Sequence, residues 1–136
     1  YYKPELPLNL TKYLLKFANS SIDISDGLID DLSKMINRQN LSFHLFENKI
    51  PVSNKLSNLI KKQRLNKINL TSNGDDYQVL FTAGIKKARI IQNASKATGI
   101  KITKIGKIVS GKDRSLIFDE KGKQIRAKSK GYIHRF

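Results

Sequence analysis

Apolar side chains recur along this chain with the period of a helix in some stretches and with that of a strand in others. Residues 8–19, 28–36 and 85–98 carry apolar positions three or four residues apart. This spacing predicts three amphipathic helices. A shorter helix is expected soon after Pro51, with Ser53 or Asn54 as its cap.

Other segments have the alternation, or the β-branched and aromatic content, that is typical of strands. They are residues 21–24, 41–46, 77–82 and 100–109. Two further short segments, 115–119 and 123–127, flank a turn at Glu120-Lys121-Gly122 and predict a hairpin. Helices that alternate with strands, followed by an antiparallel hairpin, predict an α+β or mixed α/β layered domain.

The length of the chain suits one domain spanning residues 1–136. The absence of cysteine excludes disulfides and thiolate metal sites. No apolar run approaches the roughly 18 residues that span a bilayer, so a cytoplasmic protein without a membrane partner is the default expectation. The sequence opens on Tyr1 without an initiator Met, and we expect it to be part of a longer polypeptide.

The charge balance is strongly basic, with 26 Lys and Arg against 11 Asp and Glu, a formal net charge of +15. The basic residues are spread along the whole chain and accompany no nucleic-acid-binding motif, so a solvated Lys-rich surface is expected and no specific nucleic-acid partner. The acids are more informative because six of them fall in two short stretches. These six are Asp23, Asp26, Asp30, Asp31, Asp75 and Asp76.

The first acidic stretch lies where a predicted strand ends and a predicted helix begins. Asp23 and Ser25 fall on the same side of the strand end, and Asp26 and Gly27 follow in the turn. A helix N-terminus offers free N–H groups to a phosphate, and carboxylates beside it can hold Mg2+. The alternative is structural, with Asp26 as an N-cap and the two following acids placed favourably at the helix dipole.

The second acidic stretch follows the turn signal Asn73-Gly74. Asp75 and Asp76 there are either solvated turn residues or ligands that point into a cleft. Near the end of the chain, Tyr132 is either a stacking platform for an aromatic ligand or an aromatic side chain packed on the core.

Five segments of the chain resemble motifs of one family, the thiamine-monophosphate kinases, and they occur in the same order along the chain as in the family. Ser21–Leu28 (SIDISDGL) resembles the family's Asp-Ile-Ser-Asp-Gly-Leu signature, and 73–81 (NGDDYQVLF) its Gly-Gly-Glu-Asp-Tyr-Glu-Leu-Leu-Phe motif. The weaker matches are residues 49–53, 105–108 and 131–136. The first two motifs are specific together, and the order holds across almost the whole chain.

The resemblance implies ATP-dependent phosphorylation of thiamine monophosphate to thiamine diphosphate with Mg2+. It also implies the fold of the C-terminal domain of aminoimidazole ribonucleotide synthetase, an α+β layered α/β/α sandwich with a mixed sheet. Carried over by motif, Asp23 and Asp26 would be Mg2+ ligands and Ser25 would contact ATP. Asp75 and Tyr132 would contact thiamine monophosphate. No residue of this chain is assigned as a catalytic acid, base or nucleophile.

Three departures from the family pattern stand out: Asp75 replaces a Glu, Asn73 replaces a Gly, and Arg135 precedes the final Phe. Family members also have an N-terminal ATP-binding domain that carries further Mg2+ ligands and the homodimer interface, and we expect it to be absent here. The chain is therefore expected to be the C-terminal half of a two-domain kinase and inactive alone. A non-catalytic remnant or split-chain binding module and, less favoured, a basic nucleic-acid-binding domain are the alternatives.

Overall fold

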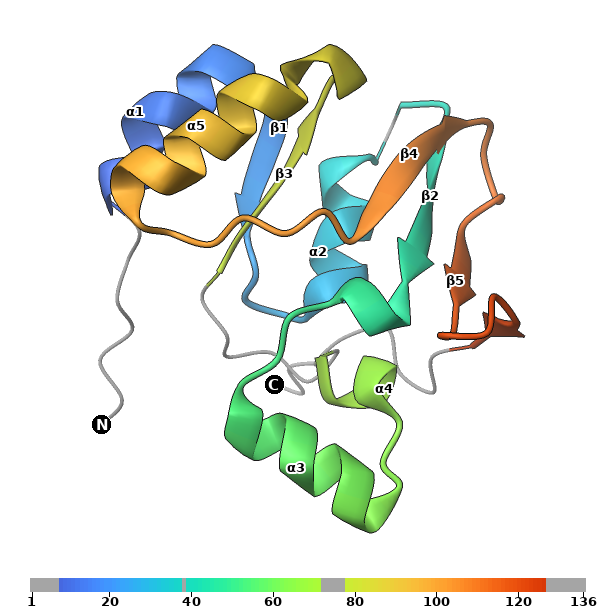
Figure 1. Ribbon diagram of the computed structural model, residues 1–136. Coiled ribbons are helices and arrows are strands. Elements are labelled where there is room, and N and C mark those ends of the chain that lie inside the picture. The colour runs from blue at the N-terminus through green and yellow to red at the C-terminus, as the bar shows by residue number, and fades with distance from the viewer. Residues whose placement is uncertain (1–7, 38, 72–77, 127–136) are drawn as a thin grey trace, which may run out of the picture.

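Helices, strands and their packing are described by a computed structural model for residues 8–37, 39–71 and 78–126 (Figure 1). The elements in chain order are α1 (Leu8–Phe17), β1 (Ala18–Asp23), α2 (Leu28–Met35), β2 (Leu41–Phe46), η1 (Glu47–Lys49), α3 (Asn54–Gln63), α4 (Lys67–Thr71), β3 (Val79–Ala83), η2 (Ile85–Lys87), α5 (Ala88–Thr98), β4 (Gly106–Ser110), β5 (Leu116–Phe118) and β6 (Gln124–Ile125). Within these ranges no helix is long and apolar enough to cross a membrane.

Among the residues that the structure describes, the strands form two separate sheets. Strands β1 and β3 pair antiparallel, with Asp23 at the end of β1 opposite Val79. The other sheet has the order β4-β2-β5-β6. Strand β2 runs antiparallel to β4 and parallel to β5, so this sheet is mixed, as predicted.

The two long outer helices, α1 and α5, lie side by side over one face of the β1–β3 sheet (Figure 1). Leu10, Phe17 and Ala94 are buried there, and the rings of Phe17 and Phe81 lie 5.2 Å apart between centroids. This small apolar cluster fixes the first helical layer against the sheet, because each helix buries the apolar stripe of its sequence.

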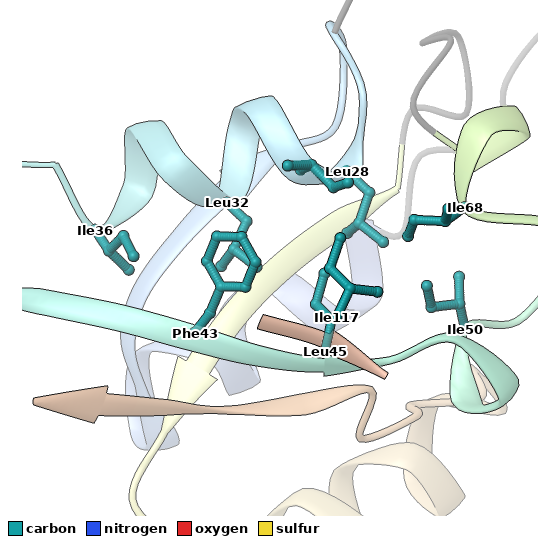
Figure 2. Close-up of a cluster of buried hydrophobic side chains, with 9 residues drawn as sticks. Leu28, Leu32, Ile36, Phe43, Leu45, Ile50, Ile68 and Ile117 are labelled. Atoms are coloured by element: carbon teal, nitrogen blue, oxygen red, sulfur yellow. The ribbon is translucent and has the colours of Figure 1, made fainter. Parts of the chain in front are cut away.

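Helix α2 lies on the other side of β1 and β3, between them and the four-stranded sheet (Figure 1). Its buried residues pack against β2, β5 and the segments around Ile50 and Ile68, as Figure 2 shows. The buried set is Leu28, Ile29, Leu32, Ile36, Phe43, Leu45, Ile50, Ile68 and Ile117. The predicted α+β fold with helix, sheet and helix in layers is confirmed, and the four-stranded sheet adds a further layer beyond α2.

Most of the predicted elements are present, with shifted ends. The strand expected at 100–109 begins only at Gly106, because Ile100 and Ile102 pack into the cluster under α1 and α5 instead of joining a sheet. The hairpin is confirmed as β5 and β6, and Ser53 is confirmed as the cap of α3, since its hydroxyl accepts the Leu56 N–H. The turn at Asn73-Gly74, both acids after it, and Tyr132 lie outside the described residues.

Candidate functional site at the β1–α2 turn

The turn between β1 and α2 comprises residues 24–27, and its Ile24 packs against the larger buried cluster. Its first residue extends the sheet, because the Ile24 N–H donates to the Gln78 carbonyl at 2.8 Å. Its last residue, Gly27, precedes the helix with φ 123° and ψ 151°. Almost only glycine adopts this conformation without strain. Gly27 therefore allows the chain to change direction abruptly between the turn and α2.

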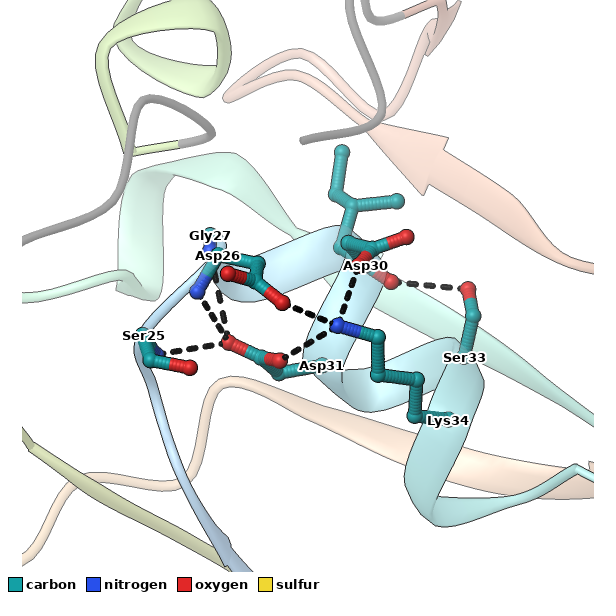
Figure 3. Close-up of polar contacts among 8 residues, drawn as sticks. Ser25, Asp26, Gly27, Asp30, Asp31, Ser33 and Lys34 are labelled. Carbon is teal, nitrogen blue, oxygen red and sulfur yellow. Dashed lines mark hydrogen bonds and ion pairs between the residues drawn. The ribbon is translucent and has the colours of Figure 1, made fainter. Parts of the chain in front are cut away.

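A single carboxylate oxygen organises this turn. The Oδ2 atom of Asp31 accepts the backbone N–H groups of Ser25, Asp26 and Gly27 at 2.8, 3.0 and 3.3 Å (Figure 3). Asp31 is 1% exposed although it is charged. A buried carboxylate is tolerated only when hydrogen bonds and an opposite charge compensate for lost hydration, and this one has both.

The opposite charge is the ammonium group of Lys34, one turn further along α2. Its Nζ atom lies 3.3 Å from Asp31 Oδ1 and 2.6 Å from Asp30 Oδ2, and it also bonds Asp26 Oδ2 (Figure 3). Lys34 therefore lies among three carboxylates. Asp26 comes from the turn, whereas Asp30 and Asp31 come from the first turn of the helix.

These contacts shift two pKa values in opposite directions. Burial alone would raise the pKa of Asp31, but the N–H groups of Ser25 and Asp26 and the nearby Lys34 ammonium hold it below its usual value. The carboxylates of Asp26 and Asp30, followed by that of Asp31, raise the pKa of Lys34 above its usual value. Both groups thus stay charged across the neutral pH range.

The structure overturns the interpretation of Asp26 as the N-cap of α2. The residue before the helix is Gly27, which makes no side-chain cap bond. Asp31 accepts the N–H groups of residues 25–27, which precede the helix, so these three groups are not available to a phosphate. The local sequence pattern does not indicate this arrangement, because the accepting carboxylate lies inside the helix, four residues after Gly27, and reaches back to the turn.

The candidate ligands taken from the motif fall into two groups. Asp23 and Ser25 are exposed near the end of β1, while Asp26 is half-buried and bonded to Lys34. Asp26, Asp30 and Asp31 can bring one oxygen each within 4.8 Å of one another, and Asp23 is not part of that group. The positions assigned to substrate, Asp75 and Tyr132, lie outside the described residues.

The donor chemistry fits Mg2+, which prefers oxygen ligands and often takes only one or two protein carboxylates. Within the part of the chain that the structure describes, Asp23 forms no ion pair, so its carboxylate is available. Asp26 presents one oxygen to Lys34, and a cation at its carboxylate would compete with that ammonium group. Asp31 is engaged by the turn N–H groups and by Lys34, so it supports the turn and is not free to bind a cation. Asp30 shares the Lys34 ammonium group and makes no bond to the turn N–H groups.

Two residues of this site, Asp31 and Lys34, have roles that sequence reasoning did not identify. The sequence contains one feature that points to each role. Asp31 lies three residues after buried Leu28 and beside buried Leu32, which places a carboxylate on the apolar face of the helix. Lys34 follows Asp30 by four residues and Asp31 by three, the spacings that bring side chains together on a helix.

The fold and the turn together define the class: an α+β domain whose acidic turn joins a strand to a buried helix. No protein-family model matches the chain. A thiamine-monophosphate kinase of Buchnera aphidicola (subspecies Acyrthosiphon pisum, strain APS) is 35% identical over 122 residues, which is 89% of this chain and 37% of that kinase.

Solved structures of thiamine-monophosphate kinases are also similar to this chain. The crystal structure of thiamine-monophosphate kinase from Stenotrophomonas maltophilia K279a superimposes with a TM-score of 0.71 at 25% identity, over 90% of this chain and 37% of that one. A structure of AaThiL complexed with AMPPCP and TMP gives a TM-score of 0.67 at 28% identity, over 96% and 38%. The chain is homologous to the C-terminal part of thiamine-monophosphate kinases, and it spans little more than a third of their length.

Proposed function

We propose that this chain is the C-terminal domain of a two-domain thiamine-monophosphate kinase, an ATP-dependent phosphotransferase that converts thiamine monophosphate to thiamine diphosphate in the cytoplasm. The observation that carries the proposal is the 35% identity to the Buchnera kinase over 89% of the chain. The complex of AaThiL with AMPPCP and TMP, a similar structure, supports a nucleotide and thiamine monophosphate as the two ligands.

In this proposal the β1–α2 turn contributes to the metal and nucleotide site. Asp23 and Asp26 would hold Mg2+, and the Ser25 hydroxyl would donate a hydrogen bond to ATP. Held by these residues, Mg2+ would supply positive charge to offset that of the phosphates, and such charge neutralisation is a main requirement of phosphoryl transfer. The chain's own part is to present Asp23 from the end of β1, and Ser25 and Asp26 from the turn that follows it.

Substrate recognition is assigned to residues outside the described ranges. Asp75 stands where the kinases have a Glu, and its side chain is one methylene shorter, so we propose a longer or water-mediated contact to thiamine monophosphate. Tyr132 would contact the thiamine moiety through its ring. Both assignments rest on motif position.

The activity then requires a second, ATP-binding domain, which would also carry the homodimer interface. Two assays of thiamine diphosphate formation with ATP and Mg2+ test this. The 136-residue chain alone is expected to give no turnover. A fusion in which this chain replaces the matching C-terminal part of the Buchnera kinase (the Buchnera fusion) is expected to give turnover.

A correctly folded Buchnera fusion without turnover would contradict the kinase proposal and favour a non-catalytic binding module. Folding of the fusion is checked by circular dichroism and by a cooperative thermal transition. Robust turnover by the isolated chain would instead contradict the need for a second domain.

A further inference from the structure

We propose that Asp31 is a positioning residue, whose buried carboxylate sets the backbone of the β1–α2 turn so that Asp26 and Ser25 face the metal and nucleotide. This inference rests on the proposed function and names a residue that the motif assignment leaves without a role. Asp31 does not itself face the ligands, because it is 1% exposed and both its oxygens are engaged within the domain.

The geometry supports a positioning role because three bonds converge on one atom. The N–H groups of Ser25, Asp26 and Gly27 all point at Asp31 Oδ2. Three successive N–H groups can meet at one acceptor only if the backbone curls around it, so the peptide planes of the turn are fixed together. The direction in which the side chains of Ser25 and Asp26 leave the backbone is fixed with them.

The other oxygen of Asp31 links the turn to the helix through Lys34. Asp31 Oδ1 lies 3.3 Å from the Lys34 ammonium, which also bonds the Asp26 side chain. Asp31 therefore holds the backbone of Asp26 directly, and Lys34 links it to the Asp26 carboxylate until a cation displaces the ammonium group. Helix α2 is itself anchored, because Leu28 and Leu32 are buried in the larger cluster. Asp31 therefore attaches the turn to a helix that is fixed in the core.

Asp30 provides a matched control on the same helix. It carries the same charge and bonds the same Lys34 at 2.6 Å, but none of the three turn N–H groups. Asp30→Asn removes one negative charge near the site and one partner of Lys34. Asp31→Asn does the same and also weakens the bonds that order the turn, because a neutral amide oxygen is a poorer acceptor than a carboxylate.

The test is an Mg2+ titration of the 15N-labelled 136-residue chain, followed by NMR at the amides of residues 23–27. Asp31→Asn is expected to raise the apparent Kd for Mg2+ at least fivefold and to increase amide exchange at Ser25, Asp26 and Gly27. Asp30→Asn is expected to change the Kd less than twofold and to leave those amides protected. In the Buchnera fusion, the Asp31→Asn variant is expected to regain most of its kcat at saturating Mg2+.

A folded Asp31→Asn chain that binds Mg2+ like the parent would overturn the inference, as would an equal loss in Asp30→Asn. If the Asp31→Asn variant does not fold, the Asp31→Glu variant tests the inference in its place. It keeps the charge but moves the carboxylate by one methylene, and the same fivefold loss is expected. Failure of both variants to fold, with Asp30→Asn folded, would assign Asp31 to stability alone and overturn the inference. No response to Mg2+ in the parent chain would instead contradict the proposed metal site itself.

Discussion

Gly27 and Asp31 are bonded to each other twice. The Asp31 N–H donates to the Gly27 carbonyl at 3.0 Å, the first bond of the α2 ladder, and the Gly27 N–H donates back to Asp31 Oδ2 at 3.3 Å. The pair closes a small ring between the end of the turn and the first turn of the helix. The helix start and the shape of the acidic turn are therefore one structural unit.

This relationship makes Gly27 sensitive to substitution. Its φ of 123° with ψ of 151° is a region that residues with a Cβ rarely adopt. Gly27→Ala is expected to lower the free energy of unfolding by about 1–3 kcal/mol, the usual cost of such backbone strain. Urea unfolding followed by circular dichroism measures the change.

Gly84→Ala is the control for that substitution. Gly84 has φ of −64°, and a Cβ there would meet no atom within 4 Å. Its replacement should be neutral or slightly stabilising, because Ala restricts the unfolded chain. Equal stability of the Gly27→Ala and Gly84→Ala variants would contradict the strain assigned to Gly27.

The acid stability of the domain should depend on Asp31. Its folded-state pKa lies below its unfolded value of about 3.9, so its stabilising effect is complete above that value and is lost as the pH falls through the folded-state pKa. The unfolding free energy of the parent chain should therefore drop below about pH 4. Asp31→Asn should be less stable at about pH 6 and should lose less on acidification.

Urea unfolding at a series of pH values, from about 6 to below about 3, provides this measurement. Asp113→Asn, at an exposed position after β4, controls for the removal of one carboxylate from the chain. A pH profile of Asp31→Asn parallel to that of the parent would contradict the role of the ionised carboxylate.

Lys34 should compete with a metal ion for Asp26, because its ammonium group bonds Asp26 Oδ2. Lys34→Met is expected to tighten Mg2+ binding about fivefold, since two like charges about 4 Å apart repel by about 1 kcal/mol even in water. The control is Lys12→Met, an exposed residue on α1 that changes the net charge equally. Equal Mg2+ affinities for the two variants, measured by the same titration, would contradict this competition.

The close approach of β4 to β2 depends on Gly106. A Cβ built at Gly106 would lie 2.2 Å from the His44 carbonyl oxygen, which belongs to the backbone and cannot rotate away. Gly106→Ala should cost about 1–3 kcal/mol, as overpacking in a fixed environment does. Thermal unfolding measures it, and a loss no greater than that of the Gly84→Ala variant would show that the strands can separate at little cost.

The sequence was sufficient to predict α1, α2, α3 and α5, most strands and the acidic turn, because each has a local signal, whereas the short helix α4 was not predicted. The buried face of α2 follows from the spacing of Leu28, Leu32 and Ile36, and the strand β2 from the alternation of Leu41, Phe43 and Leu45. Motif order identified the family. These features depend on short-range periodicity and residue type.

What the sequence did not reveal depends on contacts that local patterns do not specify. The N–H groups of the turn look free in the sequence, whereas in the structure the side chain of Asp31 folds back over them. Ile100 and Ile102 have the alternation of a strand, but in the structure they pack into the cluster under α1 and α5. In both cases tertiary packing decided between two locally acceptable structures.

The most direct measurement of the central claim is paramagnetic broadening by Mn2+, which shares the oxygen preference of Mg2+. Substoichiometric Mn2+ is added with ATP to the 15N-labelled chain, and the amide signals are followed. We predict that residues 23–27 broaden first, and that the double variant Asp23→Asn, Asp26→Asn loses this effect. Broadening that spares residues 23–27, or that persists there in the double variant, would contradict a metal–nucleotide site at the β1–α2 turn.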